Sequence, residues 1–133
     1  MGPDRAACLL ASAEVGQPIA VPGNLDTLMA GLACGEPSPV AWQELNHGAA
    51  AFMAIPDEAA VACMRLLAGL GIVGGESGVA GLAGCLLASS DPASCELLGL
   101  DVSSRVLAFI TEGAIDPESY ERLVGICPNR LEL

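Results

Sequence analysis

The sequence contains no lysine and only one histidine, His47, among its 133 residues. A lysine amine as Schiff-base partner, general base or phosphate anchor is therefore closed to this chain on its own. The net charge is −11 and the pI is about 4.1. This one-signed charge argues against nucleic acid and anionic membrane as partners, because both require clustered cations.

Paired metal ligands are also missing. The six cysteines form no CxxC pair, and with His47 as the only histidine the spacing argues against a zinc site. Most of the cysteines fall on apolar faces, and we interpret them as buried free thiols of a reduced, cytoplasmic protein. His47 precedes Gly48 at an expected helix end, where the helix dipole favours a cation, and we prefer this interpretation to a catalytic one.

Aromatic residues make up only 3% of the chain, although 53% of the residues are apolar. The core is therefore expected to consist of small aliphatic side chains. The longest uncharged run near the middle, residues 77–90, is too short to span a bilayer. The length suits one domain. High apolar content combined with a one-signed charge suggests a part of something larger.

Helices are predicted where apolar residues recur at the helical period between proline and glycine punctuation. The clearest one follows Pro56-Asp57-Glu58 and ends at Gly69, and another follows Asp116-Pro117-Glu118. The other predicted helical ranges are 4–15, 40–47, 79–88 and 92–98, with a short helix or compact loop at 25–36.

Continuous apolar runs predict buried strands at 17–21, 50–55 and 105–110. No strand is expected ahead of the first helix. The alternation of helices and strands predicts an α/β fold, a partial three-layer αβα arrangement with a mainly parallel sheet. Residues 1–133 are expected to form a single unit that is incomplete relative to a full α/β enzyme.

The stretch 73–84 is unusual, because five of its twelve residues are glycines and it contains one acid and one hydroxyl, Glu76 and Ser77. A glycine turn that leads into a helix can bind an anionic or polar ligand, but close packing of the helix also selects glycine. On this stretch alone we favour packing. For Glu76 and Ser77 taken alone, we favour a helix N-cap slightly over a role in ligand binding. Thr111, directly after an apolar run, can serve a ligand or cap a turn.

Four segments together resemble the C-terminal third of the diaminopropionate ammonia-lyase family. They are residues 27–39 (with AGLACGEP), 51–58 (AFMAIPDE), 74–78 (GGESG) and 111–117 (TEGAIDP). The resemblance covers about residues 4–125 and leaves 126–133 as a tail. This family belongs to the pyridoxal-phosphate enzymes of the tryptophan-synthase-β and threonine-deaminase superfamily, known as fold type II.

The resemblance implies pyridoxal 5′-phosphate as the cofactor, with Thr111 offering a hydroxyl to the pyridine nitrogen. Gly75, Glu76 and Ser77 would line the cofactor, and Ala33, Cys34 and Gly35 would lie near the substrate. A neutral partner of the ring nitrogen leaves the ring a weaker electron sink, which suits β-elimination. The implied reaction is elimination of ammonia from 2,3-diaminopropionate to give pyruvate.

The family's Schiff-base lysine, acid/base aspartate and phosphate-binding loop have no match here. By resemblance, the chain is therefore expected to need the N-terminal portion of the enzyme or a complementary chain. It is expected to hold no catalytic residue, and to be inactive and poorly soluble on its own. A homodimer of the full enzyme is left open. The alternatives are a non-catalytic remnant or binding module, and another pyridoxal-phosphate lyase of the threonine or serine dehydratase type.

Overall fold

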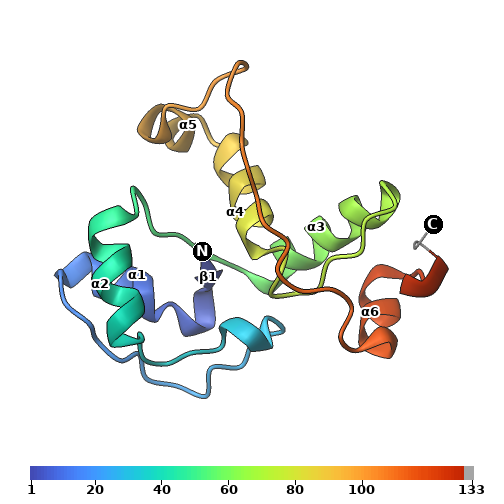
Figure 1. Ribbon diagram of the computed structural model, residues 1–133, viewed down its shortest axis with the longest axis horizontal. Coiled ribbons are helices and arrows are strands. Elements are labelled where there is room, and N and C mark those ends of the chain that lie inside the picture. Colours follow the sequence, from blue (N-terminus) through green and yellow to red (C-terminus); the bar gives the residue numbers. More distant parts are fainter. Residues whose placement is uncertain (131–133) are drawn as a thin grey trace.

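The computed structural model describes residues 1–130 and shows helices arranged around a small parallel sheet (Figure 1). No helix in this part of the chain is long and apolar enough to cross a membrane. Of the expected tail, residues 131–133 lie outside the described range. The helices are α1 (Cys8–Val15), α2 (Pro39–Gly48), α3 (Asp57–Gly69), α4 (Ala80–Ser89), α5 (Pro92–Leu98) and α6 (Pro117–Val124), with single 3₁₀ turns at Asp4–Ala6, Ala30–Leu32 and Pro128–Arg130.

The predicted helices are confirmed, except that the range 4–15 divides into a 3₁₀ turn at Asp4–Ala6 and an α-helix that begins only at Cys8. The helix ends follow ordinary capping chemistry. Ser38 caps α2 through a bond from the Ala41 amide, and Asp116 caps α6 through the amides of its first turn. Asp91 caps α5, and its hydrogen bond with Ser94 lowers the pKa of the Asp91 carboxyl. Glycines in the left-handed conformation end α1, α5 and α6.

The sheet is smaller than the sequence suggests. Strand β1 (Gly2–Pro3) pairs in parallel with β2 (Ala54–Ile55), with Gly2 opposite Ala54. The expectation that no strand precedes the first helix is therefore wrong. The predicted strand 50–55 is reduced to its last two residues, because only its end lies beside β1, where the Gly2 amide also donates to the Met53 carbonyl.

Two predicted strands are absent from the described residues. Residues 17–21 make one backbone–backbone hydrogen bond to another described segment, from the Val21 amide to the Gly35 carbonyl, and Ile19 bonds to the Ser12 hydroxyl of α1. Residues 105–110 are extended but pair with no described strand, and they leave Leu107 79% and Phe109 73% exposed. An apolar run becomes a strand only beside another strand. The α/β class with a parallel sheet is nonetheless confirmed.

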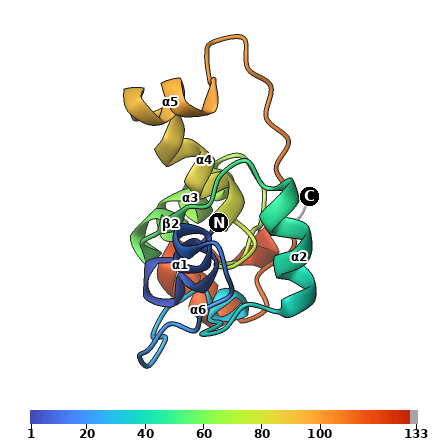
Figure 2. The ribbon, with the colours of Figure 1, turned by 90° about the vertical axis from the view of Figure 1, so that its left-hand side faces the viewer.

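The core forms around α3, which packs against α4 and α6 (Figure 2). As the composition predicts, it consists mostly of small side chains, among them Ala60, Cys63 and Ala83. Two larger groups complete it, Met29 from the segment before the second 3₁₀ turn and Tyr120 from α6. The Tyr120 hydroxyl is buried without a hydrogen-bond partner, and burial raises its pKa.

Candidate functional site

The segments that carry the family resemblance are joined to one another by hydrogen bonds. The first link lies at the start of α3. The Asp57 carboxylate accepts from the Thr27 hydroxyl at 2.5 Å and from the Leu28 amide at 2.9 Å. Asp57 thereby fixes the beginning of segment 27–39 against the end of segment 51–58.

The second link joins segment 27–39 to the glycine stretch. The Gly31 amide donates to the Ser77 hydroxyl at 3.0 Å, across 46 positions of sequence. Helix α4 begins only at Ala80, after Val79, and no side chain caps it. The interpretation of Glu76 and Ser77 as an N-cap is therefore wrong. The turn 76–79 precedes the helix, so the Ser77 side chain is free to bind another segment.

The third link joins the glycine stretch to segment 111–117. The Gly75 amide donates to the Glu112 carbonyl at 2.9 Å. A Cβ on Gly78 would lie 2.6 Å from the carbonyl oxygen and 2.8 Å from the amide nitrogen of Glu112, and a Cβ on Gly75 would overlap the Gly113 carbonyl. The glycines therefore permit close packing, as favoured from sequence, but against the 112–113 loop.

Glu112 lies where these segments converge. Its carboxylate lies 3.3 Å from the position of a Cβ on Gly31 and 2.8 Å from that on Gly75. Sequence reasoning did not select Glu112 as a site residue. The available signal was its place between Thr111 and Gly113 in a family motif, but turn acids are common and nothing local sets this one apart.

The predicted cofactor-lining residues have different environments. Gly75 is buried, Glu76 and Ser77 are half-buried, and Thr111 is exposed. Because residues 105–110 form no strand, Thr111 does not stand at a strand end in this structure. It nevertheless lies next to Glu112, and so its backbone position is fixed by the bond from Gly75 to Glu112.

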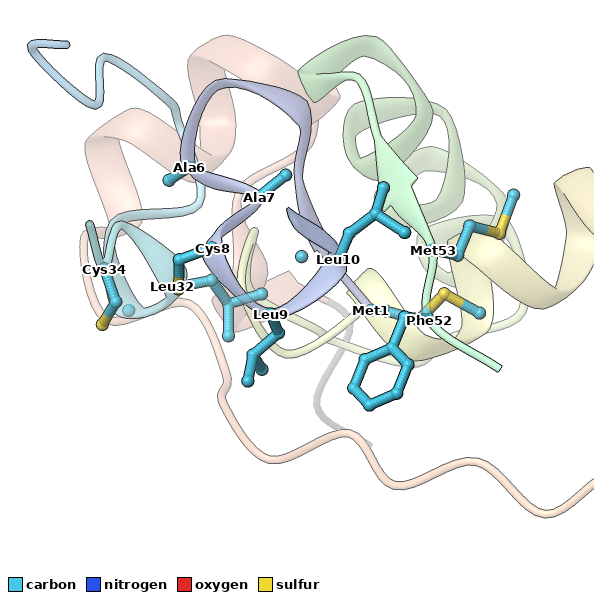
Figure 3. Close-up of a pocket in the computed structure, with 12 residues that line it drawn as sticks. Met1, Ala6, Ala7, Cys8, Leu9, Leu10, Leu32, Cys34, Phe52 and Met53 are labelled. Atoms are coloured by element: carbon cyan, nitrogen blue, oxygen red, sulfur yellow. The ribbon is translucent and has the colours of Figure 1, made fainter. Parts of the chain in front are cut away.

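Of the three predicted substrate-adjacent residues, one lies at the edge of a cavity of about 130 Å³ (Figure 3). Cys34 lines this cavity together with Gly31, Leu32 and residues of the first helix, whereas Ala33 and Gly35 are not among its lining residues. The Gly35 carbonyl instead accepts from the Val21 amide at 2.8 Å. Gly31 therefore connects the cavity to the bond with Ser77.

Cys8 borders the same cavity and is buried. Burial, and to a smaller extent the neighbouring Cys34 thiol, raises the pKa of Cys8. No histidine or arginine side chain lines the cavity within the described residues, and burial disfavours a thiolate at Cys8. Within residues 1–130, no group of three His, Cys, Asp or Glu side chains could hold a metal ion.

Comparison with known proteins connects this site to a family. A family model described as pyridoxal-phosphate dependent enzyme matches residues 1–111. The chain is 36% identical to diaminopropionate ammonia-lyase of Escherichia coli (strain K12) and 35% identical to that of Salmonella typhimurium (strain LT2). In both cases 92% of the chain is covered, and the chain spans about a third (33%) of the relative's length.

A solved structure supports the same family relationship. The crystal structure of the Escherichia coli diaminopropionate ammonia-lyase with its aminoacrylate–PLP reaction intermediate matches 92% of this chain with a TM-score of 0.79 at 35% identity. The matched region is again 33% of that protein. Because the family model covers most of its length, the chain belongs to the pyridoxal-phosphate-dependent enzymes.

Proposed function

We propose that this chain forms one wall of the cofactor site of an ammonia-lyase that acts on 2,3-diaminopropionate. The observation that carries the proposal is the hydrogen-bonded chain of motifs, from Asp57 through Gly31 and Ser77 to Gly75 and Glu112. These bonds bring together the segments that resemble the relatives, in a fold that overlays on the solved enzyme.

The residues present suit one side of pyridoxal phosphate. Thr111 offers an exposed hydroxyl for the ring nitrogen, and the turn at Gly75, Glu76 and Ser77 offers a glycine backbone that the ring can approach. When bound, the cofactor supplies an electron sink for elimination of a β-amine. The role of this chain is to orient the ring and to exclude water from one face.

Covalent attachment does not fit this chain, because it has no lysine. The lysine must come from a polypeptide that supplies the portion of the relatives' length that this chain does not span, about two thirds. We therefore propose that the chain alone does not turn over substrate, and that its functional partner is that polypeptide.

Reduction with borohydride in the presence of pyridoxal phosphate tests this proposal. Because an imine forms only with an amine, we expect no cofactor adduct by mass spectrometry other than one at the amino group of Met1, and no cofactor retained after dialysis. N-terminal acetylation should remove that adduct. A cofactor that survives dialysis of the acetylated chain would contradict the proposal.

The runner-up function is a non-catalytic binding module. The exposed apolar segment 105–110 favours it, because such a surface binds a partner without any chemistry. Addition of the first two thirds of the Escherichia coli relative separates the two functions. Restored ammonia release favours the lyase, and partner binding without turnover under any condition favours the module.

A further inference from the structure

The carboxylate of Glu112 has no role in the proposed function so far. Three of the acidic residues that the structure describes are half-buried rather than exposed, and all three lie in the segments of the site: Asp57, Glu76 and Glu112. Asp57 is satisfied by two hydrogen bonds, and Glu76 is proposed to line the cofactor. Within residues 1–130 the Glu112 carboxylate accepts no hydrogen bond and joins no ion pair. A carboxylate partly withdrawn from water is stabilised by a cationic donor.

A hydroxyl oxygen from another segment lies beside this carboxylate. Both groups approach the same point, the position of a Cβ on Gly31, with Ser77 Oγ at 3.0 Å and Glu112 Oε2 at 3.3 Å. Ser77 Oγ uses one lone pair to accept from the Gly31 amide, and a hydroxyl oxygen has a second one. Gly31 is exposed and the other two residues are half-buried, so a small ligand can reach both oxygens.

We propose that Glu112, together with Ser77, binds the β-ammonium group of 2,3-diaminopropionate and thereby selects this substrate over serine. The inference rests on the proposed function. An ammonium group carries a positive charge and three N–H donors, so it can bond to a carboxylate and to a hydroxyl oxygen at once. Serine has a neutral hydroxyl in the same place and gains no ion pair with Glu112.

The position of Glu112 favours the substrate over a side chain of the partner polypeptide as the source of the cation. Glu112 directly follows Thr111, which is proposed to meet the ring nitrogen. Its carboxylate lies beside Gly31, which borders the same cavity as Cys34. Under the proposed function, the cofactor and the substrate fill the space between these two places.

Binding the charged form also suits the bond that breaks. During elimination a group of the partner polypeptide removes the α-proton, a double bond forms between Cα and Cβ, and the Cβ–N bond breaks with its electron pair on nitrogen. A β-ammonium group therefore leaves as neutral ammonia and needs no further proton. A carboxylate beside the nitrogen favours this charged form.

Titration of the isolated chain, followed by NMR at low ionic strength, tests the recognition without any cofactor. 2,3-Diaminopropionate should shift the amide signals of Gly31, Ser77 and Glu112, and serine at the same concentration should not. Glu112→Gln keeps the shape but removes the charge, and it should weaken binding by roughly tenfold or more. Glu121→Gln is the matched control, since Glu121 on α6 is exposed and the charge change is identical.

Assembly with pyridoxal phosphate and the first two thirds of the Escherichia coli relative tests the selectivity. Glu112→Gln should lower kcat/KM for 2,3-diaminopropionate by at least roughly tenfold, because an interaction with the leaving group is lost. The inhibition constant of serine in the same reaction should change by less than about twofold, since serine makes no ion pair with this residue. Glu112→Asp should restore part of the kcat/KM.

Three results would overturn the inference. The first is a titration of the chain in which 2,3-diaminopropionate shifts none of these signals, or serine shifts them equally. The second is equal weakening by Glu112→Gln and Glu121→Gln, which indicates general attraction to an acidic chain. The third is an assembled Glu112→Gln variant that loses affinity for both ligands alike, which indicates a carboxylate that pairs with the partner polypeptide or only shapes the site.

Failure of the proposed function has a different signature. An assembly of the wild-type chain that releases no ammonia from 2,3-diaminopropionate under any condition contradicts the lyase proposal. The titration of the chain alone then still decides whether Glu112 binds the ammonium group.

Discussion

The glycine stretch 73–84 and the exposed stretch 101–111 behave in opposite ways. Apolar content alone would bury the second stretch and leave the first as a turn. In the structure Gly75 and Gly78 are buried against Glu112 and Gly113, whereas Leu107 is open to solvent. Burial here is decided by whether a complementary segment exists within the chain, and only secondarily by the hydrophobicity of the segment itself.

The largest expected effect concerns Gly78. In Gly78→Ala, the added Cβ would meet two backbone atoms of Glu112, which cannot rotate away. We expect a loss of about 3 kcal/mol in the free energy of unfolding, measured by urea denaturation. Gly81→Ala is the control, because no atom lies within 4 Å of its Cβ position in α4, and it should stabilise by up to about 1 kcal/mol. Equal losses in both variants would mean that the stretch is not packed on Glu112.

The next largest expected effect on stability is the loss of a serine hydroxyl, and it can be compared between the glycine stretch and the exposed stretch. Ser77→Ala removes the bond to the Gly31 amide and should cost about 1 kcal/mol in urea denaturation. Ser103→Ala removes a local bond to the Asp101 carboxylate in the exposed stretch and should leave the unfolding free energy unchanged within error. A larger loss at Ser103 than at Ser77 would reverse the comparison between the regions.

Tyr120 tests the packed region by a substitution that should stabilise it. Tyr120→Phe removes a buried hydroxyl that has no partner, and we expect a gain of up to about 1 kcal/mol at neutral pH. Burial raises the tyrosine pKa in the folded state, so the folded chain holds this proton more tightly than the unfolded chain. Stability should therefore fall as the pH rises beyond the ordinary tyrosine range, and Tyr120→Phe should reduce that fall. Urea midpoints from neutral to alkaline pH measure both effects.

The smallest effect is expected in the exposed stretch. Leu107→Ser removes a large apolar side chain that is already 79% exposed, so the unfolding free energy of the monomer should change by less than about 0.5 kcal/mol. The measurement belongs at low protein concentration, where self-association does not contribute. A loss comparable to that of Gly78→Ala would show that the stretch is covered in solution.

Much of the fold was predictable because the sequence signals of a helix lie within a few residues of one another. The caps at Asp91 and Asp116 and the helical period before Gly69 depend on residues a few positions apart. Strands were predicted poorly, since residues 17–21 and 105–110 have strand composition but no described strand beside them. Whether a strand forms depends on distant partners, which local composition does not contain.

For the site, the sequence identified Ser77 and Thr111 by motif, but it did not indicate what the Ser77 hydroxyl binds. Its partner is the backbone amide of Gly31. A pattern of residue types does not show which backbone amide a hydroxyl will bind. Glu112 was missed for a similar reason. Its importance comes from three glycines that approach it from two other segments, Gly31, Gly75 and Gly78.

The bond between Gly31 and Ser77 also bears on the order in which the chain folds. It joins residues 46 apart, and so it closes a long loop that contains α2 and α3. Contacts of such separation form late, because the entropy of closing the loop must first be overcome. Protection of the Gly31 amide against hydrogen exchange should therefore appear as one of the last steps of refolding, and should report in a single signal that the whole site has assembled.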